Sequence, residues 1–153
     1  LGCDLSNLNN LKTTFPHPAT HQPIAVFLDP CHMLKLVRNA LAHKRSFADQ
    51  YGRTVAWRHM EKLHGLQQEE GLHLANRLHK AHIEWQRQPK KVRLAAQVLS
   101  ISVASALAEC RALKIEGLED SARTEKFLQI INNTFDVLNS KSIYQKGWKK
   151  TYK

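Results

Sequence analysis

Asp29 is the residue whose position best suits catalytic chemistry. It follows the apolar run at residues 24–28 and precedes Pro30, so a carboxylate stands between a predicted buried strand and a predicted helix. Enzymes built from alternating strands and helices place metal ligands and acids at such strand ends. The position equally suits a plain helix N-cap. One carboxylate cannot hold a pair of Mg²⁺ ions, and the sequence offers no obvious second acid nearby.

Three polar residues near the end of the chain have a spacing that suits nucleotide recognition. Asn132, Asp136 and Asn139 stand at i, i+4 and i+7, which puts them on one face of a helix. An Asp carboxylate accepts hydrogen bonds from the N1–H and N2–H₂ groups of guanine together, and an Asn amide can serve the base or the ribose. The alternative interpretation is an ordinary solvated helix face.

Several common active-site motifs are absent from the sequence. There is neither a GxxxxGK[ST] loop nor a GxGxxG fingerprint, which disfavours a P-loop NTPase or a Rossmann domain. The nearest candidates for binding phosphates are therefore Lys90, Lys91 and Arg93. Cys31 and His32 are adjacent, and adjacent side chains on a helix diverge by about 100°, so a shared metal or a nucleophile–base pair is disfavoured.

Composition indicates a folded protein with a polyanionic partner. Hydrophobic residues make up 42% and charged residues 24%, and 23 Lys and Arg against 13 Asp and Glu give a net charge of +10. Such an excess suits nucleic acid, a nucleotide or an acidic membrane, or it simply keeps the protein in solution. The three cysteines form no CxxC pair, which favours a reducing compartment over a disulfide framework or zinc site. No apolar run reaches the roughly 18 residues of a membrane span, and the start lacks signal-peptide character.

Two basic segments are candidates for contact with DNA. Lys35, Arg38 and Arg45 fall mostly on one side of the predicted first helix, and residues 141–153 form a basic, aromatic tail. Such a surface predicts weak duplex binding without sequence preference and with a steep salt dependence. The tail can bind single strands, or it can be simply disordered.

Helices dominate the elements that must position these residues. After the strand at 24–28, buried on both faces, a helix is expected from Asp29–Pro30 to about Arg45. A turn at 51–53 and an extended stretch at 54–57 follow, and helical patterning resumes at Arg58. Two helices broken near Gly71 are expected next, and Pro89 ends the second one.

The clearest expected helix is continuous from residue 90 to residue 113. Its apolar residues alternate steps of three and four, and its alanines and serines permit close packing, as in the central helix of a bundle. Gly117 ends that region, and Ser121 is expected to cap a last helix that runs to about Asn139. The residues predicted to face inward on it are Phe127, Ile131, Phe135 and Leu138.

The segment Leu28-Asp29-Pro30-Cys31-His32-Met33-Leu34-Lys35-Leu36-Val37-Arg38-Asn39 resembles the Asp-x-CHMLKLxRN block of P element-like DNA transposases, a family that includes the THAP-domain transposases of animals. Similar blocks follow in the family's order at residues 71–78, 81–83, 91–100, 102–107, 135–140 and 146–149. The resemblance spans nearly the whole chain.

This resemblance implies a mainly α fold, in which a helical GTP-binding insertion is attached to a short β-strand and helix fragment of an RNase H-like catalytic domain. Residues 1–45 correspond to the catalytic fragment, 46–140 to the insertion, and 141–153 to a basic tail leading back to the catalytic domain. Asp29 then matches the second of three acidic Mg²⁺ ligands, whose partners lie outside this sequence. The chain alone is therefore expected to be inactive in strand cleavage or transfer.

The resemblance also implies ligands and partners. Asp136 and Asn139 match positions that contact GTP, and Asn76 begins an Asn-Arg-Leu-His segment where the P element enzyme has Asn-Lys-x-Asp. With Lys91 at the phosphates, these are the expected cofactor-binding residues. The family further implies Mg²⁺, transposon-end DNA, a homo-oligomer of the full-length protein and a nuclear location, with no membrane. The alternatives are a domesticated, catalytically inactive DNA- or protein-binding module, or a free-standing helical domain that binds nucleic acid through its basic face.

Overall fold

The computed structural model describes residues 12–26, 28–49, 51–70 and 78–139. Within these residues, helices account for most of the chain and the strands are short. The elements, in chain order, are β1 (Thr14–Pro16), β2 (Pro23–Ala25), α1 (Pro30–Lys44), β3 (Ser46–Ala48), β4 (Thr54–Ala56), α2 (Arg58–Glu70), α3 (Lys80–Ile83), the 3₁₀ turn η2 (Trp85–Arg87), α4 (Val92–Val98), α5 (Ile101–Ala112) and α6 (Ala122–Leu138).

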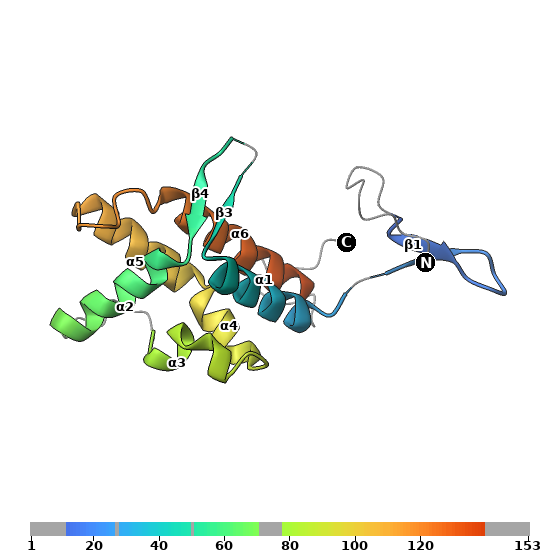
Figure 1. Ribbon diagram of the computed structural model, residues 1–153. Helices are drawn as coiled ribbons and strands as arrows, with labels where there is room; N and C mark the ends of the chain where they lie inside the picture. Colours follow the sequence, from blue (N-terminus) through green and yellow to red (C-terminus); the bar gives the residue numbers. More distant parts are fainter. Residues whose placement is uncertain (1–11, 27, 50, 71–77, 140–153) are drawn as a thin grey trace.

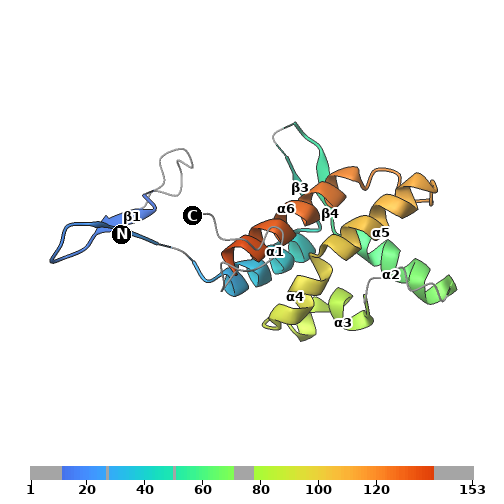
Figure 2. The ribbon, with the colours of Figure 1, turned by 180° about the vertical axis from the view of Figure 1, so that it is seen from behind.

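The helices pack into one body, and the first hairpin stands away from it (Figure 1). Helix α6 lies along both α5 and α1, while α4 packs against α1 and α3. The view from behind shows the same arrangement, with β1 and β2 extending away from the helices (Figure 2). The predominance of helix agrees with the fold class expected from the sequence.

Helix α1 begins and ends where the sequence predicts. Asp29 is its N-cap, and the two carboxylate oxygens accept hydrogen bonds from the backbone N–H of Cys31 at 3.0 Å and of His32 at 3.2 Å. Pro30 occupies the first helical position, where its missing N–H costs nothing. The helix ends at Arg45, whose φ of 69° lies in the left-handed region.

The apolar run at 24–28 does not form the predicted strand buried on both faces. The strand β2 covers Pro23–Ala25 and pairs with β1 in an antiparallel register, Phe15 opposite Ile24. Ile24 is half-buried, and Leu28 is 68% exposed. A two-stranded hairpin has two open faces, and no other described element packs against this one closely enough to cover either face.

The second hairpin confirms the predicted turn and extended stretch. Strands β3 and β4 pair antiparallel, with Phe47 opposite Val55. Gly52 has a φ of 74°, a conformation that glycine adopts without the penalty a side chain would bring. Thr54 to Ala56 then carry the chain into α2, which begins at Arg58 as expected.

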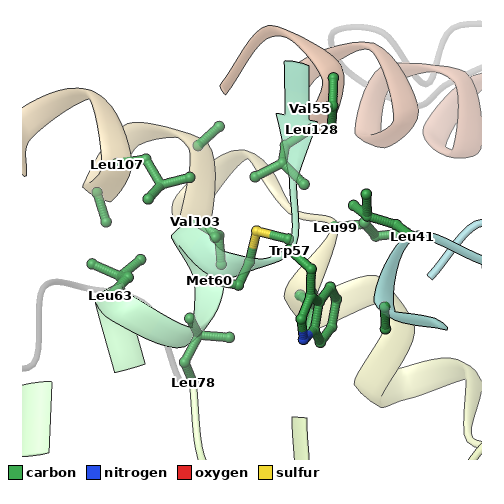
Figure 3. Packing of buried hydrophobic residues seen from close by; sticks show 14 of the residues in the cluster. Leu41, Val55, Trp57, Met60, Leu63, Leu78, Leu99, Val103, Leu107 and Leu128 are labelled. Carbon is green, nitrogen blue, oxygen red and sulfur yellow. The ribbon is translucent and has the colours of Figure 1, made fainter. Parts of the chain in front are cut away.

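The core lies where α2, α4 and α5 meet α1, α6 and β4 (Figure 3). Trp57, which connects β4 to α2, is fully buried beside Met60 and Leu63. Small side chains on α5, including Ala104 and Ala106, are also buried and allow the neighbouring backbones to approach closely. The other labelled members of the core are Leu41, Val55, Leu78, Leu99, Val103, Leu107 and Leu128.

The predicted continuous helix over 90–113 is in fact two helices. Helix α4 ends at Val98, and α5 begins at Ile101. Between them, Ser100 is extended, with ψ of 160°; its hydroxyl donates to the carbonyl of Gln97 at 2.8 Å and accepts from the N–H of Val103 at 3.3 Å. The serine side chain thus replaces helical backbone hydrogen bonds and caps a new helix.

The segment Val92–Ala112 is long and apolar enough to cross a membrane if only length and composition are considered. The structure shows that it is bent at Leu99 and Ser100 and that one side of each helix is buried in the body. Val98, Val103 and Leu107 are each at most 1% exposed. Burial in the protein core therefore accounts for its apolar composition.

Helix α6 covers the predicted last helix, but its inward face differs from the prediction. Leu128 is fully buried, whereas Leu138 is 45% exposed. Phe127, Ile131 and Phe135 are half-buried and pack against the core as expected. Ser121 occupies the N-cap position without the predicted side-chain cap, because its hydroxyl donates to Glu125 instead.

Between α2 and α4, the second helix predicted there is much shorter than expected. Only α3 and η2 are helical within residues 78–89, and η2 ends before Pro89. The predicted break near Gly71 lies outside the described residues.

Candidate functional site

Helix α6 presents the polar face predicted from the sequence. The amide nitrogen of Asn132 donates to the carboxylate of Asp136 at 3.2 Å, and its amide oxygen accepts from the N–H of Ile101 at 3.3 Å. This second bond fastens α6 to the first turn of α5. Asp136 is half-buried, and Asn139 is exposed at the C-cap of α6. The structure thus joins Asn132 to Asp136 and places Asn139 at the end of the same helix.

Lys91 is exposed at the N-cap of α4 and lines a hollow of about 690 Å³. We call this cavity, between α3, η2 and α4, the α4 hollow. The three polar residues of α6, Asn132, Asp136 and Asn139, are not among the residues that line it. Its lining residues are His79, Ala81, His82, Gln88, Lys91, Arg93, Leu94 and Gln97.

Arg38 does not lie on the exposed basic face predicted from the sequence. Its side chain is fully buried, and one guanidinium nitrogen, Nη2, donates to the carbonyls of Gln88 at 3.2 Å and Pro89 at 3.1 Å. Its Nε donates to the side chain of Asn39, whose amide in turn donates to the Pro89 carbonyl. Arg38 stands four residues after the buried Leu34, so its spacing already matched the apolar face of α1.

The Arg38–Asn39 pair therefore acts as a clamp on the chain entering α4. Loop carbonyls that no helix or strand satisfies need donors when they approach the core, and these two side chains provide them. Burial lowers the pKa of Arg38, which nevertheless stays protonated because a guanidinium loses its proton only at very high pH. Through this clamp, α1 fixes the position of the loop that carries Gln88, at one edge of the α4 hollow.

His82 connects α3 to α4 beneath the α4 hollow. It is 1% exposed; its Nδ1 accepts from the N–H of His79 at 2.8 Å, and its Nε2 lies 3.0 Å from the Oε1 of Gln97. Because an amide oxygen only accepts, Nε2 of His82 donates this bond to Gln97. The NH₂ group of Gln97 then remains as a hydrogen-bond donor at the hollow.

Asp29 has the geometry of a helix cap. Both carboxylate oxygens are engaged by the N–H groups of Cys31 and His32, and no group of three metal-ligating side chains occurs among the described residues. A two-metal centre needs two or three carboxylates. The described residues therefore do not form a complete Mg²⁺ site, and we derive no catalytic step from Asp29.

Two predicted contributors, Asn76 and the basic tail at 141–153, lie outside the described residues. The remaining members of the predicted basic face are also altered by the fold. Arg45 forms a two-pronged ion pair with Glu61, which neutralises its charge. With Arg38 buried as well, Lys35 is the one residue of that face that is neither fully buried nor paired with an acid in the described part of the chain; its side chain is half-buried.

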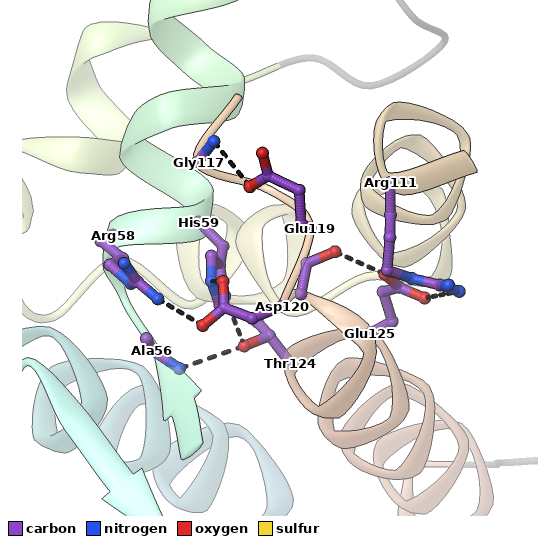
Figure 4. Close-up of polar contacts among 10 residues, drawn as sticks. Ala56, Arg58, His59, Arg111, Gly117, Glu119, Asp120, Thr124 and Glu125 are labelled. Carbon is purple, nitrogen blue, oxygen red and sulfur yellow. Dashed lines mark hydrogen bonds and ion pairs between the residues drawn. The ribbon is translucent and has the colours of Figure 1, made fainter. Parts of the chain in front are cut away.

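A polar junction that the sequence analysis did not anticipate joins β4, α2 and α6 (Figure 4). His59 is fully buried; its Nδ1 lies 2.7 Å from the hydroxyl of Thr124, and its Nε2 lies 3.0 Å from Asp120. The Thr124 hydroxyl also accepts from the N–H of Ala56 at 3.1 Å. Arg58 pairs with the same Asp120.

The junction continues to a second acid, Glu125, which unlike Asp120 is buried. Glu125 is 6% exposed, and its carboxylate accepts from Arg111 at 2.8 and 3.1 Å and from Ser121 at 2.6 Å. We use the name polar junction for the set Arg58, His59, Arg111, Asp120, Ser121, Thr124 and Glu125.

The pKa values in the polar junction reflect burial and pairing. Burial lowers the pKa of His59 more than the hydrogen bond and charge of Asp120 raise it. Burial alone would raise the pKa of Glu125, but Arg111 and Ser121 stabilise the anion and lower it. The junction therefore holds a neutral imidazole and a charged carboxylate near pH 7. No local sequence motif marks the polar junction, because the two residues that contact the His59 ring, Thr124 and Asp120, lie more than 60 positions away from it in the sequence.

Comparisons with known proteins agree with this helical architecture. A family model described as the TNP-like, GTP-binding insertion domain matches residues 31–151. The chain is 37% identical over 143 residues to the DNA transposase THAP9 of Homo sapiens, a match that covers 92% of this chain and 16% of that protein. It is 34% identical over 144 residues to the transposable element P transposase of Drosophila melanogaster, covering 88% of this chain and 18% of that protein.

A solved structure of the Drosophila P element transposase strand transfer complex superposes with a TM-score of 0.77 at 30% identity. That match covers 89% of this chain and 30% of the other. The chain thus spans less than a fifth of the length of the two curated relatives.

Proposed function

Because the chain belongs to the TNP-like, GTP-binding insertion domain family, we propose that it binds GTP and serves as the nucleotide-binding part of a P element-like DNA transposase. The observation that carries the proposal is the polar face of α6. It lies within the matched residues and holds a half-buried carboxylate, Asp136, beside an amide, Asn132.

Guanine recognition follows from the chemistry of Asp136. A carboxylate accepts hydrogen bonds at both of its oxygens, and Asn132 already donates to one of them, Oδ2 of Asp136. Guanine offers N1–H and N2–H₂ side by side, whereas adenine has an acceptor at N1 and no amino group at C2. Asn139, one turn further along α6, is proposed to contact the base or the ribose.

The phosphates of the nucleotide need cations. Lys91 is exposed at the start of α4, and we assign it to this role, with Lys90 beside it. Asn76 remains a proposed member of the site from the family resemblance. Mg²⁺ commonly accompanies nucleotide phosphates.

Calorimetry on the purified chain tests the nucleotide assignment. GTP and GDP are expected to bind, while ATP is not. Asp136→Asn is expected to lower GTP affinity about ten- to a hundredfold, from loss of roughly 1.5–3 kcal/mol of charge-assisted hydrogen bonding. The same variant should gain affinity for xanthine nucleotides, whose O2 accepts from an amide.

Glu116→Gln is the matched control, because it removes one exposed carboxylate from the loop after α5 and leaves α6 unchanged. Equal binding of ATP and GTP, or an Asp136→Asn variant that keeps full guanine preference, would contradict the assignment.

The wider transposase role is also a proposal. In a longer protein, the domain would support synapsis, cleavage and strand transfer of transposon-end DNA in the nucleus, within a homo-oligomer. Asp29 would then be one of three Mg²⁺ ligands. The second candidate is a domesticated module without catalysis, and it is favoured if the surrounding gene lacks the other two acids. Cleavage by the chain alone that disappears in Asp29→Ala would refute the expectation that this fragment is inactive.

A further inference from the structure

We propose that the α4 hollow is a second binding site, which takes one nucleotide unit of a single nucleic-acid strand, with Arg93 on its phosphate. The proposal does not depend on guanine binding at Asp136. It begins from the charges around the hollow.

Arg93 is the one arginine of the described residues whose guanidinium has no protein partner. Every other described arginine is engaged by a carboxylate or by backbone carbonyls. The pairs are Arg38 with the carbonyls of Gln88 and Pro89, Arg45 with Glu61, Arg53 and Arg123 with Asp49, Arg58 with Asp120, Arg87 with Glu84, and Arg111 with Glu125. Arg93 is exposed and lines the α4 hollow instead.

The lining of the α4 hollow contains no carboxylate. Lys91, which the proposed function assigns to the phosphates of GTP, lies on the same rim, so the two proposed sites share this cation. Lys90 precedes it without an acidic partner in the described part of the chain. Concentrated positive charge without a counter-ion favours an anion, and a guanidinium binds phosphate oxygens in a two-pronged geometry.

The hollow is large enough to hold more of a ligand than a phosphate group alone. A volume of about 690 Å³ falls within the roughly 300–1,000 Å³ of ligand pockets. Besides Arg93, the hollow offers the free NH₂ group of Gln97, the side chain of Gln88 and the exposed ring of His79. Amides can bond to the edge of a base, and an imidazole ring can stack on its face.

These groups suit a single strand rather than a duplex. In a duplex the bases are stacked and paired, so only phosphates and groove edges are presented to a surface. A single strand can place a base in a cavity while its phosphate remains at the rim. The clamp of Arg38 and Asn39 keeps the Gln88 side of the hollow in position before the strand arrives.

The test measures binding of a fluorescein-labelled dT12 strand to the full chain by fluorescence anisotropy. Arg93→Gln is expected to weaken binding about three- to tenfold and to reduce the slope of log K against log salt by about 0.7. Lys126→Gln is the matched control. It removes one exposed cation from α6, away from the hollow, and should change affinity less than about twofold.

A second variant tests the interior of the hollow. Gln97→Glu keeps an acceptor for His82 but replaces the amide donor by a negative charge. It should weaken dT12 binding by at least about tenfold while the melting temperature stays within a few degrees. An abasic strand of the same length should bind more weakly than dT12.

The remaining outcomes each overturn the proposal. If Arg93→Gln and Lys126→Gln weaken binding equally, the contact is general charge attraction. If Arg93→Gln weakens binding of a 12-base-pair duplex as much as it weakens binding of dT12, the site does not select single strands. If saturating GTP displaces dT12, and Arg93→Gln weakens GTP binding as much as it weakens dT12 binding, the hollow is a subsite for the nucleotide's phosphates.

Asp136→Asn should leave dT12 binding unchanged, which separates this proposal from the proposed guanine site.

Discussion

The polar junction and the α4 hollow contain similar kinds of side chain, but these side chains have opposite roles. In the junction, arginine, histidine and acidic residues are brought together, and each charge meets a partner within the protein. At the hollow, lysine, arginine and histidine gather without a carboxylate. Paired charges hold elements in place, whereas unpaired charges at a cavity are available to a ligand.

Burial sharpens this contrast. Glu125 and His59 of the junction are 6% and 0% exposed, so their charge and hydrogen bonds must be satisfied inside the protein. Arg93 and Lys91 of the hollow are exposed and remain solvated without a partner. Loss of a junction residue should therefore lower stability, and loss of a hollow residue should lower binding.

The largest expected effect is from Glu125→Ala. It removes the acceptor for Arg111 and Ser121 and leaves the buried Ser121 hydroxyl without its partner. The free energy of unfolding should fall by about 2–4 kcal/mol, measured by urea denaturation. The control is Glu119→Ala, which loses one exposed bond from the Gly117 N–H and should cost less than about 1 kcal/mol. Similar losses in both variants would show that the junction adds nothing beyond a surface contact.

An intermediate effect is expected from His59→Gln, and it depends on pH. Burial holds the pKa of His59 below its ordinary value of 6.5, against the smaller opposing effect of Asp120. The unfolded chain therefore binds more protons below pH 6.5, and the stability due to His59 is lost as the pH falls. The variant should be less stable by about 1–2 kcal/mol at pH 7.5, and this difference should shrink towards pH 5.5.

Urea denaturation at several pH values measures that difference. The pKa of His64 is also lowered, chiefly by burial, but His64 is present in both proteins, so its contribution cancels. Asp120 and Glu125 have lowered pKa values as well, and they destabilise the protein only in more acidic solution, below about pH 4.5. A difference that does not change with pH would show that His59 has no titration-linked role.

The smallest expected effect on stability comes from the hollow. Lys90→Gln combined with Arg93→Gln removes two cations that have no partner in the described residues. The free energy of unfolding should change by less than about 0.5 kcal/mol, with any gain arising from reduced repulsion. A loss above about 1 kcal/mol would mean that these cations stabilise the fold, which would break the contrast with the junction.

Features set by neighbouring residues could be predicted from the sequence. Asp29 and Pro30 begin α1 because capping involves backbone groups only two and three positions away. The Gly52 turn and the strand that follows it depend on equally local preferences. Family membership also follows from the sequence, because ordered blocks along the chain carry it.

The interruption between α4 and α5 shows where local patterns fail. Apolar spacing continues without change from residue 92 to residue 110, so periodicity predicts one helix. Ser100 nevertheless ends the first helix and caps the second, and the bend lets Leu99 and Val103 both reach the core. A serine permits either outcome, and only packing against α1 and α6 decides between them.

The sequence by itself determined the helical class, the start of α1, the second hairpin and the polar face of α6, because each depends on residues a few positions apart. Tertiary structure alone decided that Arg38 is buried, that His59 meets Thr124, and that Arg93 is left without a partner. The first two outcomes depend on contacts between residues 50 to 65 positions apart. From the sequence alone, a charged side chain can face solvent, form an ion pair or bind buried carbonyls. The fold decides among these by bringing distant groups to it, because a buried charge is costly unless it is paired.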